Sequence, residues 1–154
     1  MNLTLRPAGA ADRDLLFRIY ASTREEELAL TDWDEAQKNA FLTQQFTAQD
    51  THYREHYPGA VFSLILLDGE PVGRLYLHHR PDDIRIMDIA LLPPYRNRGI
   101  ATALLRDLQA EAAAAAKPLT IHVEQFNPAL RLYTRLGFRP ITEHGVYLLM
   151  EWRP

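Results

Sequence analysis

The segment that decides how this chain folds spans residues 84–102, Ile84-Arg85-Ile86-Met87-Asp88-Ile89-Ala90-Leu91-Leu92-Pro93-Pro94-Tyr95-Arg96-Asn97-Arg98-Gly99-Ile100-Ala101-Thr102. Its first part is mostly apolar and predicts a buried strand, which two prolines end. A short turn with two arginines and one glycine follows. A long helix then begins at Gly99 and places apolar residues on one face. The segment therefore predicts a strand, a turn and a helix in direct succession.

The turn and the start of the helix predict a binding site for an anion. The first N–H groups of a helix have no partner within it, and the helix dipole adds about half a positive charge there. Gly99 and Ala101 have little side-chain bulk, so a ligand can approach the backbone. Arg96 and Arg98 add guanidinium groups suited to phosphate. We interpret residues 96–102, the cradle loop, as a pyrophosphate site; an ordinary turn with solvated arginines is the alternative.

The rest of the chain supplies further strands and helices around this segment. Before it, the hydrophobic pattern predicts strands over residues 2–6, 60–67 and 72–78, and helices after Asp12, from Thr31 or Asp32, and over residues 50–57. After it, the pattern predicts the helix 99–117, a strand at 119–123, a helix at 128–136 and strands at 141–143 and 146–152. We expect one α/β (α+β) domain over residues 1–154, in which helices cover a mixed sheet.

Length and composition limit the possible classes. The chain has 154 residues, 47% of them hydrophobic, a formal net charge of −3 and no cysteine. A chain of this size can form a core as a single domain, and the acidic balance argues against a general nucleic-acid binder. No apolar run is long enough to span a bilayer, and the first residues lack the features of a secretory signal. We therefore expect a cytoplasmic protein without a nucleic-acid or membrane partner.

Two blocks of the sequence resemble the GNAT superfamily of N-acetyltransferases. Arg96-x-x-Gly99-x-Ala101 after an apolar strand is similar to the acetyl-CoA loop of that family, Gln/Arg-x-x-Gly-x-Gly/Ala. The segment Asn127-Pro128-Ala129-Leu130-Arg131-Leu132-Tyr133-Thr134-Arg135-Leu136-Gly137-Phe138 resembles its later block, an asparagine before a helix that ends in Leu-Tyr-x-x-Leu-Gly-Phe. The resemblance implies a mixed, mostly antiparallel sheet of about seven strands with about four helices. It also implies acetyl-CoA as cosubstrate and no metal.

The resemblance also implies roles for individual residues. The strand before the cradle loop and the strand from Leu119 would splay apart around the pantetheine arm of the coenzyme. The implied coenzyme contacts are the backbone of Ile89, Ala90 and Leu91, the loop residues Arg96, Asn97, Arg98, Gly99, Ile100, Ala101 and Thr102, and the side chain of Asn127. Tyr133 would lie near the sulfur as general acid. A phenol can supply a proton to a departing thiolate, which is consistent with that role.

Acetyl transfer to an amine also requires a group or a water chain that removes the amine's proton. His122 and Glu124 alternate with Thr120 on one face of their predicted strand, and Asp88 lies on the facing strand. Some peptide-acetylating relatives have a glutamate at the position of His122, and a histidine can act as a base at neutral pH. A half-exposed strand face without a chemical role is the alternative for all three residues.

Two further features of the implied acetyl transfer concern the oxyanion and the order of attack. A backbone N–H near Leu91 would stabilise the oxyanion that develops on the acetyl carbonyl. Because the chain has no cysteine, no acetyl-cysteine intermediate can form on it, which favours direct attack in a ternary complex.

Two further motifs have simpler interpretations. His52-Tyr53-Arg54-Glu55-His56 matches the H-x-x-E-H zinc signature, but nothing in the sequence indicates a third ligand, so we expect an ordinary helix surface. The acidic run from Glu25 to Glu27, followed by Asp32, Asp34 and Glu35, could attract a cationic amine. A solvated helix end is the alternative, since most charge runs have no other role.

These observations favour an N-acetyltransferase that moves the acetyl group of acetyl-CoA to a primary amine on a small molecule or peptide. The sequence is compatible with a homodimer. The alternative is a module of the same fold that binds an acyl-CoA as a sensor or interaction partner without turnover.

Overall fold

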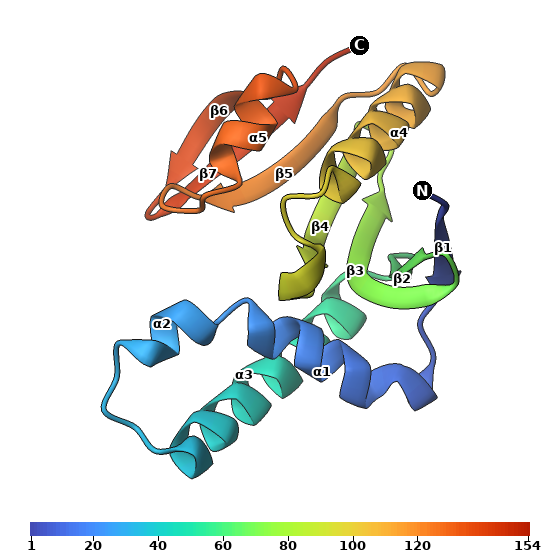
Figure 1. Ribbon diagram of the computed structural model, residues 1–154. Coiled ribbons are helices and arrows are strands. Elements are labelled where there is room, and N and C mark those ends of the chain that lie inside the picture. The colour runs from blue at the N-terminus through green and yellow to red at the C-terminus, as the bar shows by residue number, and fades with distance from the viewer. The chain divides into compact units, whose positions relative to one another are not determined.

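The computed structural model describes residues 1–154, in which seven strands form one mixed sheet (Figure 1). The strands are β1 (Leu3–Pro7), β2 (Val61–Leu67), β3 (Glu70–His79), β4 (Ile84–Leu91), β5 (Leu119–Glu124), β6 (Arg139–His144) and β7 (Tyr147–Trp152). Their order in the sheet is β1-β2-β3-β4-β5-β7-β6. The described ladders are antiparallel except for β4 with β5, which are parallel. The expected fold class is confirmed.

Five α-helices accompany the sheet, where about four were expected. They are α1 (Arg13–Ser22), α2 (Glu25–Ala29), α3 (Glu35–His56), α4 (Ile100–Ala114) and α5 (Leu130–Arg135). Two short 3-10 turns, η1 (Ala10–Asp12) and η2 (Pro93–Tyr95), precede α1 and the cradle loop. None of these helices has the length and apolar character needed to cross a bilayer.

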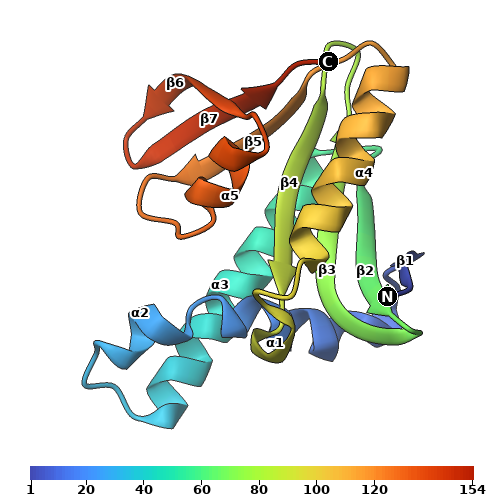
Figure 2. The ribbon, with the colours of Figure 1, turned by 45° about the horizontal axis from the view of Figure 1, so that its top comes forward.

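Internal contacts divide the chain into two compact units, and the division runs through β3 and β4. Unit 1 comprises Met1–Leu75 and Ala90–Arg96, and unit 2 comprises Tyr76–Ile89 and Asn97–Pro154. In unit 1, β1 pairs with β2, and α1 crosses α3 in both views (Figures 1 and 2). The ring of Phe46 is buried there and lies 5.6 Å from that of Phe17 and 5.8 Å from that of Tyr20. This aromatic contact joins the two helices.

Unit 2 contains the end of the sheet that includes β5, β7 and β6, with α5 lying across these strands (Figure 1). The predicted apolar stripe of α4 is confirmed, because Ile100, Leu104, Leu105 and Leu108 are buried. The parallel ladder between β4 and β5 has only three pairs, from Ile84 opposite Leu119 to Ile86 opposite Ile121. Both strands continue within unit 2 after the last pair. The expected splay therefore begins after Ile86 and Ile121.

The N-terminal helices differ from the sequence-based prediction. One helix, α3, replaces the two helices expected, and it begins after Asp34 and not at Thr31 or Asp32. The Asp34 carboxylate accepts a hydrogen bond from the backbone N–H of Gln37, and the Gln37 side chain accepts one from the N–H of Asp34. This reciprocal capping box defines the helix start. The acidic run Glu25–Glu27 forms the first turn of α2, where the helix dipole favours negative charge.

Candidate active site

The cradle loop has the backbone conformation of an anion site. Asn97 and Gly99 both have positive φ, 59° and 83°, which turns the chain sharply between η2 and α4. The N–H of Ala103 is the first to bond within the helix, to the Gly99 carbonyl at 3.0 Å, so the preceding N–H groups point out of its end. A Cβ at Gly99 would meet no atom within 4 Å. The start of α4 is therefore open to a ligand and carries the donors that a pyrophosphate requires.

Arg96 anchors the loop, in addition to any contact with a ligand. Its Nε donates to the Leu91 carbonyl at 2.9 Å, and its Nη2 lies 3.3 Å from both the carbonyl and the hydroxyl oxygens of Ser22. Ser22 is buried at the end of α1. These bonds use most of the guanidinium donors that the sequence suggested for phosphate. Arg96 thus ties the loop to the end of β4 and to α1, while Arg98 remains the arginine suggested for phosphate.

Gly73 allows β3 to approach the end of β4 closely. A Cβ at Gly73 would lie 2.2 Å from the Ala90 carbonyl oxygen and 3.1 Å from the Leu91 Cα. The N–H of Leu92 donates to the Val72 carbonyl at 2.8 Å, which holds the two segments together. Sequence reasoning missed this residue, although an isolated glycine inside a predicted strand can signal a close backbone approach. Gly73 therefore sets the position of the backbone that is expected to pair with pantetheine.

Tyr133 is nearly buried, yet its hydroxyl has no protein partner. The residue is 5% exposed, and its ring lies 5.7 Å from that of Phe138 at a steep angle. The hydroxyl oxygen is not fully enclosed, so the tip of the side chain is accessible. Burial, with a smaller effect of the Asp88 carboxylate, raises the pKa of the phenol well above its ordinary value. Tyr133 therefore keeps its proton at physiological pH and can donate it to a hydrogen bond.

The three residues considered for the base do not lie together. Arg85 is opposite Thr120 in the ladder, so His122 and Glu124 share a face with Thr120 and Arg85. Asp88 follows the alternation of Ile84 and Ile86 and lies on the other face, where it acts on Tyr133. The register therefore places Asp88 on the facing strand but on the other face of the sheet from His122 and Glu124. Both His122 and Glu124 are exposed.

A series of hydrogen bonds connects His122 to Arg85, Thr120 and Asp83. The Nη1 of Arg85 lies 3.2 Å from the Nδ1 of His122, and the Nε of Arg85 donates to the Thr120 hydroxyl at 2.8 Å. The Thr120 hydroxyl donates in turn to Asp83 at 2.6 Å. Partial burial and then the positive charge of Arg85 lower the pKa of His122 from its ordinary value. Sequence reasoning identified His122 but not this network, because its members come from segments far apart in the chain.

Asn127 begins the turn that leads into α5. Its side-chain oxygen accepts a hydrogen bond from the Ala129 N–H at 2.9 Å, as in an Asx turn. The residue also lines a hollow of about 360 Å³ with five neighbours from residues 125–131. The oxygen is thus used within the chain, and the amide nitrogen is the group that can reach a ligand.

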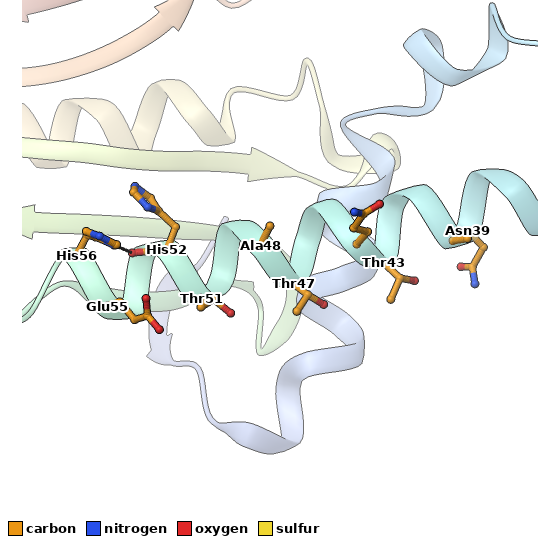
Figure 3. A pocket seen from close by; sticks show the side chains of 10 residues that line it. Asn39, Thr43, Thr47, Ala48, Thr51, His52, Glu55 and His56 are labelled. Carbon is orange, nitrogen blue, oxygen red and sulfur yellow. Dashed lines mark hydrogen bonds between the residues drawn. The ribbon is translucent and has the colours of Figure 1, made fainter.

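A hollow of about 830 Å³, open to solvent, lies along one face of α3 (Figure 3). Only residues 39–56 line it, and none belongs to the cradle loop. The H-x-x-E-H motif is at one end, where the rings of His52 and His56 stack at 4.5 Å and Glu55 points away from them (Figure 3). The Nδ1 of His56 hydrogen-bonds the His52 carbonyl. No group of three metal-ligating side chains forms there or elsewhere.

Comparisons with known proteins agree with this geometry. The chain matches the acetyltransferase (GNAT) family over residues 22–138. Its fold is similar to that of the PaiA N-acetyltransferase from Thermoplasma acidophilum in complex with coenzyme A, with a TM-score of 0.75, 15% identity and full coverage of both chains. An acetyltransferase from Thermus thermophilus has a TM-score of 0.72 and 20% identity, covering 100% of this chain and 98% of its own.

A GNAT family acetyltransferase from Elizabethkingia anophelis with acetyl-CoA bound has a TM-score of 0.58 and 21% identity, covering 99% of each chain. At these identities the structural likeness establishes the fold. No curated protein matches the sequence. The family match covers most of the chain and includes both blocks, the cradle loop and the segment from Asn127 to Phe138. The chain therefore belongs to the GNAT family of acetyltransferases.

Proposed function

We propose that this protein transfers the acetyl group of acetyl-CoA to a primary amine on a small molecule or peptide. The observation that carries the proposal is the cradle loop, whose positive-φ glycine opens the N-terminus of α4 to an anion. Two of the structurally similar proteins contain CoA or acetyl-CoA, which supports the choice of donor. The family match over residues 22–138 supports the reaction class.

In this proposal the chain binds the coenzyme mainly through its backbone. The N–H groups of residues 97–102 and the side chain of Arg98 hold the pyrophosphate, and Arg96 keeps the loop in place. The backbone of residues 89–91 pairs with the pantetheine arm, and Asn127 contributes its amide nitrogen to coenzyme binding. The short ladder between β4 and β5 supports this arrangement, since it leaves their later residues unpaired with each other.

The chemistry is a direct exchange of one bond for another. The amine nitrogen bonds to the acetyl carbon, the carbon–sulfur bond breaks, and the amine's proton passes to a base on the face of His122 and Glu124. A backbone N–H near Leu91 stabilises the oxyanion, and the Tyr133 hydroxyl donates a hydrogen bond to the departing sulfur.

Calorimetric titration with CoA tests the donor site. We expect Gly99→Glu to abolish CoA binding, because a carboxylate would occupy the opening at the start of α4 and repel phosphate. Gly69→Glu is the matched control, since Gly69 has a similar φ of 86°, is also free of neighbours within 4 Å, and lies in the turn between β2 and β3. Equal CoA affinity in wild type and the Gly99 variant would exclude the cradle loop as the binding site.

Release of CoA from acetyl-CoA in the presence of amines tests catalysis. The panel contains polyamines, amino acids, aminoglycosides and peptides with free N-termini. We expect turnover with at least one class and none with the corresponding acetylated amines. Tight acetyl-CoA binding without CoA release across the whole panel would contradict the enzyme and indicate a binding module of the same fold.

A further inference from the structure

We propose that Arg85 is a positioning residue that fixes His122 as a neutral imidazole with its proton on Nε2. In this state His122 donates a hydrogen bond at the surface of the sheet and cannot accept the proton of the amine, which passes to Glu124. The part that concerns the amine rests on the proposed function. The state of the His122 ring does not.

Arg85 is held rigidly beside His122. Its side chain is 11% exposed and lies 3.6 Å from the Asp83 carboxylate, which is 7% exposed. Two nitrogens of Arg80 bond to Asp83 at 2.6 and 2.7 Å, and the Thr120 hydroxyl bonds to the same carboxylate and to Arg85. A guanidinium confined on several sides cannot turn away without leaving Asp83 and Thr120. The contact with His122 is therefore a built feature of unit 2.

The direction of the hydrogen bond sets the tautomer. A guanidinium in a protein is always protonated and has only donors, so at 3.2 Å the Nδ1 of His122 must accept. An imidazole with a free lone pair on Nδ1 is neutral and carries its hydrogen on Nε2. Protonation of Nδ1 would place two N–H groups and two positive charges against each other. His122 is thus held in the form that offers a donor to a ligand.

Partial burial, and basic side chains from three segments, oppose protonation of His122. They are Arg85 on β4, Arg80 in the segment before β4, and His144 at the end of β6. The acidic groups around this network are Asp83, which is bonded to Arg80 and Thr120, Glu124, two residues along β5, and Glu151 on β7, which is paired with Arg153 at 2.6 Å. The residue directly opposite His122 on β7 is Leu149, which has no charge. The Arg85 guanidinium is the charged group in hydrogen-bond contact with the ring, and it fixes which ring nitrogen accepts.

This state has a consequence for the acceptor. An amine loses its proton to a lone pair, and Glu124 has carboxylate lone pairs on the same face as His122. The Nε2–H of His122 would instead bind an oxygen of the acceptor, such as a carbonyl or carboxylate. In this proposal His122 binds the acceptor and Glu124 deprotonates it.

Histidine NMR tests the proposal without any turnover. Long-range proton–nitrogen spectra of protein with labelled histidine distinguish the two tautomers, and His122→Gln identifies the signal of His122. We expect the Nε2–H tautomer in wild type, and a rise in the pKa of His122 in Arg85→Gln. Arg85→Lys keeps the charge but not the planar fork, so the tautomer should become mixed. Arg106→Gln on the exposed side of α4 is the matched control and should change neither property.

The variants should fold, because Asp83 retains Arg80 and Thr120 as partners when Arg85 is replaced. Circular dichroism checks this. An Nδ1–H tautomer in wild type, or a pKa of His122 that is the same in wild type and Arg85→Gln, would overturn the positioning role. Either result is independent of whether the protein acetylates an amine.

The pH profile of kcat/KM tests the assignment of the base once an acceptor is identified. We expect Glu124→Gln to lower kcat/KM about 10²-fold or more and to remove the acid limb of the profile. His122→Gln keeps an N–H donor and should retain that limb. Loss of the acid limb in His122→Gln, with Glu124→Gln retaining it, would overturn the proposal and make His122 the base. CoA binding without turnover on any amine would contradict the proposed function, and the NMR result would still decide the role of Arg85.

Discussion

At the scale of single residues, the Tyr133 phenol is held in a form suited to donating a hydrogen bond. Its raised pKa makes full proton transfer to a thiolate costly, because a thiol has a pKa of about 8.5 in water. A hydrogen bond to the departing sulfur has no such cost. We predict that Tyr133→Phe lowers kcat about 10²-fold while leaving the affinity for CoA nearly unchanged, as measured by steady-state kinetics and calorimetry.

Tyr53→Phe on α3 is the control, because it removes the same hydroxyl from a helix of unit 1. The pH profile adds a second readout. Since burial and Asp88 keep the proton on Tyr133, kcat of the wild type should show no decline caused by Tyr133 between pH 7 and about 10. Equal kcat in wild type and Tyr133→Phe would show that the phenol has no part in the reaction.

Asp83 links the stability of the fold to pH. Burial alone would raise the pKa of its carboxyl, but hydrogen bonds from Arg80 and Thr120 and the charges of Arg80 and Arg85 outweigh that effect and lower it. The native state then binds protons less readily than the unfolded chain, so this stabilisation is complete above pH about 4 and is lost as pH falls through the lowered pKa. We predict that Asp83→Asn costs about 3 kcal/mol at pH 7, and that the difference from wild type shrinks below pH 4.

Urea unfolding across pH 2.5–7 measures this effect. Asp82→Asn is the matched control, because Asp82 is the exposed neighbour of Asp83 in the same turn. A constant difference between Asp83→Asn and wild type over the whole pH range would mean that the variant acts through packing and not through charge.

Residue types were easier to predict than their partners. Arg96 stands out in the sequence as a cation beside an anion site, but its bonds to Leu91 and Ser22 depend on how α1 meets the end of β4. His122 was recognised as a titratable group on an exposed face. Its proton state depends on Arg85, thirty-seven residues away in the chain. Such partners are set by the register between strands, which a local pattern does not contain.

At the scale of elements, strands and the long helix α4 were predicted within a few residues, because alternation and a continuous apolar stripe are local properties. The helices before β2 were harder. Ala36 and Ala40 are exposed, and Phe46 is the one buried residue of α3. A helix with one buried residue has little periodic signal, so the clearest local feature of α3 is the capping box that marks its start.

The close approach of β3 to β4 yields a prediction at this scale. Gly73→Ala adds a methyl group 2.2 Å from the Ala90 carbonyl oxygen, so the backbone of one strand must shift. We expect a loss of about 1–3 kcal/mol in stability from this overpacking. We also expect CoA affinity to fall by about tenfold or more, because the displaced residues 90–91 are those proposed to pair with pantetheine.

Gly9→Ala is the control, since a Cβ at Gly9 meets only the Asp12 carboxylate, at 3.9 Å. Urea unfolding and calorimetric titration with CoA measure both quantities. A destabilised Gly73→Ala protein with unchanged CoA affinity would separate the strand contact from the coenzyme site, and the proposed pairing of residues 90–91 would then be wrong.

At the scale of the whole molecule, the charge of the protein and that of its proposed donor have the same sign. The chain carries a formal net charge of −3, and CoA is also an anion. Binding must therefore depend on local groups, namely the N–H donors at the start of α4 and Arg98, against a mildly unfavourable overall field. Composition alone pointed away from an anionic ligand, and only the cradle loop reversed that expectation.

Ligand binding should stabilise the whole chain if the cradle loop forms only in the folded state. At a CoA concentration one hundred times its Kd, linkage adds about 2.7 kcal/mol to the free energy of unfolding. For a protein of this size we predict a rise in Tm of roughly 5–11 °C by differential scanning calorimetry. CoA should not raise the Tm of Gly99→Glu. It should raise the Tm of Gly69→Glu, which is strained at an equivalent φ, as much as that of the wild type. A similar rise in both variants would mean that CoA binds outside the cradle loop.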